Sequence, residues 1–349
     1  MEHPEISNLT PFHAELLHLE DENASFVCCA VVKGTYGITD KGVLEVTAPQ
    51  PPLEYAGTFW GDPERSSYRY EPETAFIKPT TDVVLIGEAY APRSGTHTVD
   101  VGLKVGPVQK VVRVFGDRYW VKTGGSIIAT RPQPFERIPL IYERAFGGWD
   151  RASADERAWR CEFRNPLGCG FGDPLRYVQD GKVAMPNLED PNHLIRRYGD
   201  TPPPAGFGFV APQWHPRARY AGTYDAAWER ERKPRLPTDF DRRFFNAASE
   251  GLIAPSYLNG GEDVVVVNAS ARPQLRFRLP GIASPTCIVE LRGGKIEKLL
   301  TNLDTVIVNT IENLVILIWR AFMVVRNGPF DVVAAEITAN LDPPRRATV

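Results

Sequence analysis

The chain has 349 residues, of which 43% are hydrophobic and 24% are charged, and its formal net charge is -3 at pH 7. This composition is ordinary for a soluble globular protein. The near balance of 40 basic and 43 acidic residues excludes the strongly basic surface that binds nucleic acids or anionic membranes, so we expect neither as a partner.

The first part of the chain, residues 10–138, predicts β-strands. Ser25–Thr39 is rich in Val, Cys, Tyr and Thr, and the turn Asp40-Lys41-Gly42 before Val43–Thr47 indicates a β-hairpin. Thr81–Tyr90 predicts one further strand. Apolar residues alternate from Val99 to Val105, as in a half-buried strand. Two more strands are expected at Gln109–Phe115 and Arg118–Lys122.

The middle part, residues 139–250, predicts an ordered surface of packed loops. Long irregular segments are usually functional or disordered, and disordered segments lack aromatic residues. This one is aromatic, and irregular loops with Trp, Tyr and Arg are typical of binding surfaces. Four of the seven tryptophans lie here: Trp149, Trp159, Trp214 and Trp228.

Short helices are expected only in this middle part. Ser153 and Glu156 have the spacing of a capping box. Asp190-Pro191 would supply a cap and a first-turn proline to a helix over residues 193–197. Two further short helices are expected within Asp225–Arg232 and Asp239–Ala248.

The last part, residues 251–340, again predicts strands. Arg292-Gly293-Gly294-Lys295 indicates a tight hairpin turn, because glycine accepts the positive φ that such turns need. The sequence therefore predicts one mainly β domain over residues 1–349, with antiparallel β-sandwich-like sheets and a long loop-rich insertion that carries a few short helices. The strands expected here are Asp263–Val267, Leu275–Leu279, Thr286–Leu291, Thr305–Val308, Leu314–Val325 and Asp331–Ile337.

Three features set an expectation for location. The N-terminus lacks the basic start and apolar run of a signal peptide. The most apolar window, Leu314–Val325, contains Arg320 and is shorter than the about 20 apolar residues of a membrane span. The odd number of cysteines, five, argues against a disulfide framework. We expect a reduced, cytoplasmic protein.

Motifs for metal or nucleophilic chemistry are weak. No two histidines have helix-face zinc spacing, and Cys28 and Cys29 would point to opposite faces of a strand. The glycine run at residues 168–172 lacks the strand and helix that flank a phosphate-binding loop. Cys169 would need an activating histidine, for which His193 or His215 could serve. We therefore expect no metal, no cofactor and no catalytic residue.

Carboxylates beside aromatic residues leave one enzymatic alternative open. Paired carboxylates among Trp and Tyr are typical of glycosidases, so a carbohydrate-active hydrolase or a sugar-binding module is the alternative function. Most of these acids have a basic neighbour in the sequence, such as Arg144 beside Glu143, which favours ion pairs that tether loops. The acids concerned are Glu143, Asp150, Glu189, Asp190 and Asp225.

A series of short motifs carries a family resemblance. They run from Thr10-Pro11-Phe12 to Leu317–Ala321 and together resemble a bacterial family known as domain of unknown function 2169, which is associated with type VI secretion. Cys169 departs from the family pattern, where a basic residue is expected. The motifs include Val32–Tyr36, Tyr70-Glu71, Lys78–Asp82, Tyr142–Gly148, Arg164–Pro166, Pro186–Pro191, Pro204–Gly208, Pro216-Arg217, Tyr220–Asp225 and Gly260–Glu262.

The resemblance implies a non-enzymatic adaptor or chaperone in the cytoplasm. It would hold a toxic effector protein and help to load it on the secretion spike, so its partners would be the effector and the spike proteins. Four glycines would let the loops turn tightly: Gly147, Gly148, Gly168 and Gly170. The residues expected to bind the partner are Glu143, Arg144, Trp149, Arg164, Asn165, Asn187, Arg217, Tyr220, Tyr224, Asp225 and Trp228.

Overall fold

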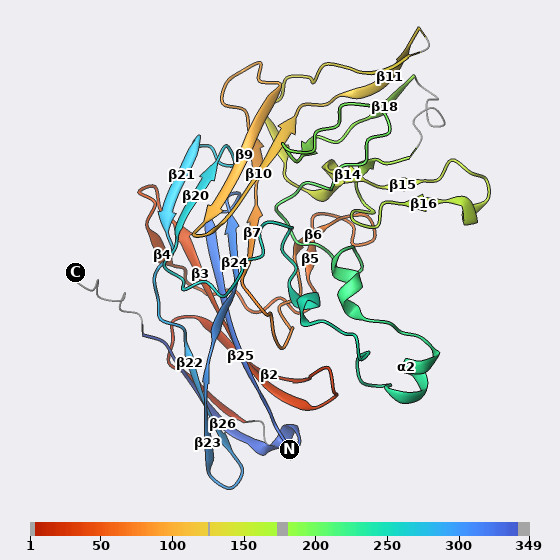
Figure 1. Cartoon of the computed structure of the whole chain (residues 1–349). Coiled ribbons are helices and arrows are strands. Elements are labelled where there is room, and N and C mark those ends of the chain that lie inside the picture. The colour runs from red at the N-terminus through yellow and green to blue at the C-terminus, as the bar shows by residue number, and fades with distance from the viewer. Residues whose placement is uncertain (1–3, 125, 173–180, 341–349) are drawn as a thin grey trace.

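The computed structural model describes residues 4–124, 126–172 and 181–340. In this part of the chain the fold is mainly β, with several mostly antiparallel sheets and a few short helices, as predicted. Figure 1 shows long strands on the left and, on the right, a region of loops and short strands that belongs to the middle of the chain. Buried apolar residues from all three parts of the sequence form one continuous core.

The largest sheet has the strand order β2-β3-β25-β24-β7, with β4 paired to β3. The predicted β3–β4 hairpin is confirmed, and Gly42 in its turn has a φ of +72°. Cys28 and Cys29 point to opposite faces of β3, yet both are buried because both faces of this strand are covered. The strands are β2 (His13–Glu20), β3 (Phe26–Ile38), β4 (Leu44–Val46), β7 (Asp82–Ile86), β24 (Asn302–Asn309) and β25 (Leu314–Val324).

The second sheet has five strands in the order β19-β10-β9-β20-β21. In β9 the buried apolar residues alternate with more exposed residues such as Asp100 and Lys104, which confirms the half-buried strand predicted from Val99 to Val105. The strands are β9 (Thr98–Val105), β10 (Val108–Phe115), β19 (Leu188–Glu189), β20 (Asp263–Val267) and β21 (Gln274–Arg278). Because β19 comes from the middle part, the loop region pairs directly with a sheet of the flanking sequence.

The single strand predicted at Thr81–Tyr90 is wrong. It is two strands, β7 and β8 (Glu88–Tyr90), which belong to different sheets. β7 runs parallel to β24, whereas β8 pairs with β13 (Arg137–Pro139). The break lies at Gly87, where a Cβ atom would come 2.6 Å from Thr310 Oγ1, so a larger residue there would force the Thr310 side chain to move.

The third sheet has the order β1-β26-β22-β23 and lies at the lower end of the molecule in Figure 1. Its β22–β23 hairpin turns at Gly293 and Gly294, with φ of +88° and +79°, which confirms the predicted turn. The strands are β1 (Glu5–Asn8), β22 (Thr286–Leu291), β23 (Lys295–Leu300) and β26 (Val332–Thr338).

Short elements make up the rest. In or beside the loop region, β12 (Ser126–Ala129), β11 (Tyr119–Thr123) and β18 (Lys182–Ala184) form a three-stranded sheet in that order. Small strand pairs are β14 (Phe146–Gly147) with β17 (Cys169–Gly170), β15 (Trp149–Asp150) with β16 (Arg160–Cys161), and β5 (Thr58–Phe59) with β6 (Tyr68–Tyr70). The described helices are α2 (Ala226–Glu231) and the 3-10 turns η1 (Tyr142–Arg144), η2 (Glu156–Ala158), η3 (Arg217–Ala221), η4 (Arg242–Phe245) and η5 (Pro329–Asp331). None of the described helices is long and apolar enough to span a bilayer.

Helix predictions in the middle part are only partly confirmed. The helix within Asp225–Arg232 exists as α2, with Asp225 as its cap. The expected capping box is wrong, because Asp155 caps η2 in place of Ser153. The helix after Asp190-Pro191 is also wrong: the Asp190 carboxylate accepts from the backbone N–H of Asn192 and forms a turn. Of Asp239–Ala248 only η4 is helical.

Candidate functional site

A buried network of charged side chains underlies the loop region. The Lys78 ammonium lies 2.5 Å from Glu71 Oε1 and 2.8 Å from Asp82 Oδ2. Arg217 reaches the other oxygen of Glu71 at 3.0 Å. Next to this group, Lys33 pairs with Glu73 at 2.8 Å and Arg320 with Asp304 at 2.6 Å. The four cations and four carboxylates are all buried: Lys33, Lys78, Arg217, Arg320, Glu71, Glu73, Asp82 and Asp304.

The pKa values in this network indicate that its cations stay charged and paired with carboxylates, as in a structural ion-pair network. Burial alone would lower the pKa of Lys78, but Asp82 and Glu71 raise it above its ordinary value. Burial also opposes the charge of Arg320, but Asp304 together with weaker effects such as that of Glu73 raises the pKa of this guanidinium above its ordinary value. The space bordered by Glu71, Glu73, Lys78 and Arg320 is about 10 Å³, which holds at most one water molecule. The carboxylates of Glu71 and Glu73 therefore have no room for a sugar beside them.

Several of the predicted loop residues lie close together around Asn165. We call this set, Asn165 with Gly147, Gly148, Gly168 and Gly170, the Asn165 cluster. Asn165 is fully buried and donates from Nδ2 to the carbonyls of Tyr142 and Phe146 at 2.8 and 3.1 Å. Gly147 adopts a φ of +151°, and its Cβ would lie 2.1 Å from the Asn165 carbonyl oxygen. A Cβ on Gly168 would lie 2.4 Å from Asn165 Nδ2. The close approach of these chain segments requires glycine.

Gly148 and Gly170 belong to the same Asn165 cluster. Gly148 and Gly170 have φ of +103° and +90°. A Cβ on Gly148 would lie 2.5 Å from the Gly168 carbonyl oxygen. Gly170, in β17, pairs with Gly147 in β14, so the four glycines bring the two strands together.

Four more candidate residues tether loops through hydrogen bonds. Glu143 accepts from the backbone N–H and hydroxyl of Ser67 at 2.6 and 2.8 Å. Arg144 donates to Asn187 Oδ1 at 2.9 Å, and the buried Asn187 donates to the Phe115 carbonyl at 3.0 Å. Arg164 forms a two-point ion pair with Glu162. The four side chains therefore make their hydrogen bonds to other residues of the same chain.

Arg217 and Tyr220 border an apolar cavity of about 390 Å³ on the outside of the network. We call it the Tyr220 cavity. Arg217 is buried and donates to the carbonyls of Phe244 and Val210 at 2.7 and 2.8 Å, so it forms part of the cavity floor. The guanidinium of Arg243 stacks 4.4 Å from the Tyr220 ring centre and forms one wall. Most of the remaining lining is apolar, with Pro79, Val210, Pro216, Ala248, Ile253 and Ala254, and the polar residues Thr80, Asn246 and Glu250 also border it.

Residues 223–239 form a projecting loop that contains α2, and we call it the α2 loop. The Asp239 carboxylate closes its base, since it accepts from Thr223 N and Oγ1 at 2.9 and 2.8 Å. Tyr224 is 53% exposed, and its ring contacts that of Trp228 at 4.8 Å between centres. Figure 1 shows α2 well away from the sheets, at the lower right.

The α2 loop is braced internally and against the first β-hairpin. Asp225 caps α2 by accepting from Trp228 N at 2.8 Å, and Trp228 Nε1 donates to the Arg235 carbonyl at 2.8 Å. Leu236 N donates to the Glu22 carbonyl at 3.1 Å, in the turn between β2 and β3. The loop therefore holds the exposed Tyr224 ring and the half-buried Trp228 ring in a defined position.

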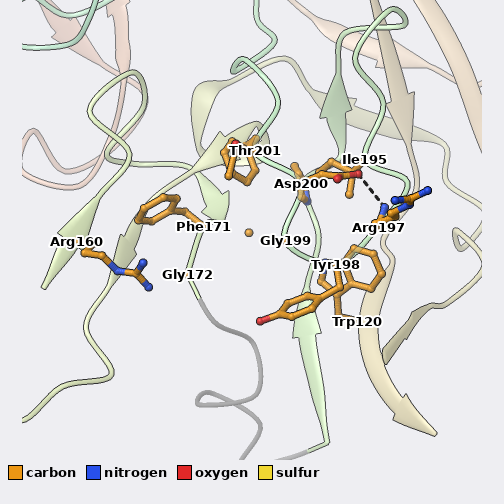
Figure 2. A pocket seen from close by; sticks show the side chains of 13 residues that line it. Trp120, Arg160, Phe171, Gly172, Ile195, Arg197, Tyr198, Gly199, Asp200 and Thr201 are labelled. Atoms are coloured by element: carbon orange, nitrogen blue, oxygen red, sulfur yellow. Dashed lines mark hydrogen bonds between the residues drawn. The ribbon is translucent and has the colours of Figure 1, made fainter. Parts of the chain in front are cut away.

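Trp149, the remaining candidate, lies in another part of the loop region. It is partly exposed in β15, and the guanidinium of Arg151 lies 5.1 Å from its ring centre. A smaller cavity of about 170 Å³ is found nearby. Figure 2 shows Arg160 and Phe171 on one side of it and Trp120 and Tyr198 on the other. Arg160 pairs with Asp150, the residue after Trp149.

The carboxylates behind the glycosidase alternative are engaged in structural contacts. Asp150 pairs with Arg160, and Glu189 is buried between Arg118 and the Ile195 N–H. Burial raises the pKa of Glu189 although Arg118 opposes the shift. Asp190 binds His193 at 2.9 Å in place of the arginines near it in the sequence. Ion pairs do tether these loops, but the partners differ from the sequence neighbours.

Cysteine and histidine side chains show no nucleophilic arrangement in the described contacts. Burial raises the pKa of Cys169 to about 11, which disfavours the reactive thiolate. His193 binds Asp190, and the His215 ring packs on Phe163. The five cysteines are free thiols, and in the described residues no three His, Cys, Asp or Glu side chains are grouped to hold a metal ion.

One close pair was not anticipated from the sequence. Lys110 Nζ lies 2.5 Å from Ser249 Oγ and donates to the Glu250 carbonyl at 2.7 Å. Burial lowers the pKa of Lys110 to about 8. A serine beside a lysine of low pKa is one arrangement of nucleophilic catalysis, but Ser249 is only 3% exposed and closed to a substrate. The two residues are 139 positions apart, so no sequence signal links them.

Comparisons with known proteins agree with the resemblance carried by the motifs. A family model described as "Uncharacterized protein conserved in bacteria (DUF2169)" matches residues 23–320. Curated proteins and solved structures give no match. The matched segment includes the buried charge network, the Asn165 cluster and the α2 loop. The chain belongs to the DUF2169 family of bacterial proteins.

Proposed function

We propose that this protein is a non-enzymatic adaptor that binds a type VI secretion effector in the cytoplasm and helps to load it on the secretion spike. The link to secretion comes from the family resemblance. The observation that carries the binding role is the α2 loop, whose base is closed by Asp239 and which carries the exposed Tyr224 ring against the half-buried Trp228 ring.

Preorganisation supports recognition by this loop. A flexible loop loses conformational entropy when a partner binds, whereas a loop already held in place loses less. Here the Asp239, Asp225 and Glu22 contacts hold the loop before binding. Tyr and Trp are the residue types that most often dominate protein interfaces.

The Tyr220 cavity supports the same role. Asp241 N donates to the Tyr220 carbonyl at 2.9 Å, which joins η3 to the segment that follows the α2 loop. The cavity volume of about 390 Å³ and its apolar lining suit one or two apolar side chains of a partner. The α2 loop and this cavity are therefore proposed as one effector-binding surface.

The relative orientation of the Tyr224 and Trp228 rings favours a protein partner over a sugar. A sugar-binding platform needs aromatic faces that lie nearly in one plane. The Tyr224 and Trp228 rings are inclined at 67°, so they do not form such a platform. Among the expected site residues, Tyr220, Tyr224, Trp228 and Asp225 belong to this proposed surface, and the buried Arg217 lines its cavity. Asn165 and Asn187 make their contacts elsewhere in the loop region.

Co-purification tests the proposal. The tagged full chain is isolated from its native cells and the bound proteins are identified by mass spectrometry, with Tyr224→Ala/Trp228→Ala beside the wild type. We expect a toxin-like protein and spike components with the wild type, and their loss with the double variant. Recovery of neither, together with binding of the pure chain on a glycan array, would overturn the adaptor role in favour of sugar binding.

A further inference from the structure

The edge strand β23 has the features of a strand-addition site. It is the last strand of the third sheet and, within the described residues, pairs only with β22. Its outer edge therefore carries backbone N–H and C=O groups that are free to pair with another strand. Figure 1 shows the β22–β23 hairpin at the lower end of the molecule, away from α2.

The exposed side chains on β23 determine which residues an added strand should carry opposite them. Ile296 and Leu300 are 66% and 65% exposed, and Lys298 lies exposed between them on the same face. The row continues on β22, where Ile288 lies opposite Lys298. Lysine on an edge strand opposes indiscriminate pairing. An added strand is therefore favoured when it places an acidic residue opposite Lys298 and aliphatic residues opposite Ile296 and Leu300.

A cavity at the end of the same strand adds a second observation. Leu300 also lines a space of about 150 Å³, which we call the Phe322 cavity. A cavity of that size accommodates a benzene ring. Arg320 lies in its lining, is buried, and has one guanidinium nitrogen, Nη2, without a hydrogen-bond partner. The other apolar lining residues are Phe76, Ile77, Tyr257, Ala321 and Phe322.

We propose that β23 and the Phe322 cavity together bind one extended segment of a partner protein by strand addition. The segment runs antiparallel to β23. One side chain with an apolar stem and an acceptor oxygen enters the cavity toward Arg320, and the following alternate residues are aliphatic, acidic and aliphatic. This site is separate from the α2 loop and does not rest on the adaptor role.

A synthetic peptide tests the site. The probe is the fluorescein-labelled peptide Gln-Thr-Val-Thr-Glu-Thr-Val-Thr, and its partner probe carries Lys in place of Glu. Both are titrated into the full chain and into Lys298→Glu, an exposed position whose variant should fold normally. We expect the wild type to prefer the Glu peptide by about fivefold, since a cross-strand charge pair contributes up to about 1 kcal/mol, and Lys298→Glu to reverse the preference.

Amide hydrogen exchange shows where the peptide binds. Light scattering shows whether a second copy of the chain occupies the same edge. Slower amide exchange in residues 295–300 on addition of the Glu peptide is the expected result. Equal affinity for the two peptides, or no saturable binding, would overturn the site. A dimer by light scattering that Ile296→Lys converts to a monomer would also overturn it, because the edge would then pair with a second copy of the chain.

Discussion

The ammonium group of Lys78 lies 2.8 Å from the carboxylate of Asp82, four residues later, and both side chains are buried. Asp82 begins β7 and also accepts from Ala247 N and Asn246 Nδ2 at 2.8 and 2.9 Å. The Asp82 carboxylate thus joins the largest sheet to the segment after η4 through these two hydrogen bonds. The loop region is held on the sheets by buried charge, which makes it a firm base for the proposed binding surface.

Removing Lys78 is expected to destabilise the whole fold. Lys78→Met leaves Glu71 and Asp82 buried with one cation fewer, and breaking a buried ion pair costs about 3–5 kcal/mol. The free energy of unfolding in urea measures this loss. Lys295→Met is the control, because the exposed pair of Lys295 with Glu297 contributes at most about 1 kcal/mol. Equal effects of the two substitutions would show that the network does not support the fold.

Gly168→Ala is expected to destabilise the packing of the Asn165 cluster. The added Cβ would lie 2.4 Å from Asn165 Nδ2 and 2.6 Å from the Ala145 carbonyl oxygen. Forcing atoms into a packed site costs about 1–3 kcal/mol, measurable by thermal unfolding. Gly208→Ala is the matched control, since its Cβ would meet nothing closer than the Tyr142 ring at 3.7 Å. A Gly168→Ala protein as stable as the control would contradict the packing described.

Regular strands were predictable from the sequence, and their partners were not. Asp263–Val267 and Thr286–Leu291 were predicted with the bounds of β20 and β22, because valine, isoleucine and threonine are frequent in them and glycine turns lie nearby. β2 was missed because HAELLHLE lacks the β-branched residues typical of strands. The buried charges and their roles were also missed, since pairs such as Glu71 with Arg217 join residues 146 positions apart.

Lys110 is expected to make stability rise with pH. Its pKa is about 8 in the folded protein and 10.5 ordinarily, so between these values the unfolded chain binds more protons. Its cost to stability is full below pH 8 and disappears as the pH rises toward 10.5. Compared with Lys110→Met, the wild type should gain about 2 kcal/mol from about pH 7 to pH 10. Urea unfolding across that range measures the gain.

Lys104→Met provides the control for this pH series. Lys104 is exposed on the neighbouring strand β9. Its substitution should leave the dependence of stability on pH unchanged. If the difference between wild type and Lys110→Met stayed constant with pH, the lowered pKa of Lys110 would be disproved.

The Asp239 carboxylate is expected to hold the α2 loop closed. Asp239→Ala removes both hydrogen bonds to Thr223, so backbone amides in residues 223–236 should exchange with deuterium at least severalfold faster. Exchange in the large sheet should not change. Asp62→Ala is the control, because Asp62 makes a similar contact with Glu64 N in a different loop. Unchanged exchange in the α2 loop would mean that Asp239 is not its closure.

The most direct test of the account is the affinity of the purified effector for the α2 loop. Calorimetric titration compares the wild type with Tyr224→Ala/Trp228→Ala and with Tyr55→Ala, whose ring is 55% exposed elsewhere on the surface. Loss of a single interface hot spot weakens binding by at least about thirtyfold. The account predicts at least that loss for the double variant and none for Tyr55→Ala. Full affinity in a folded double variant would contradict it.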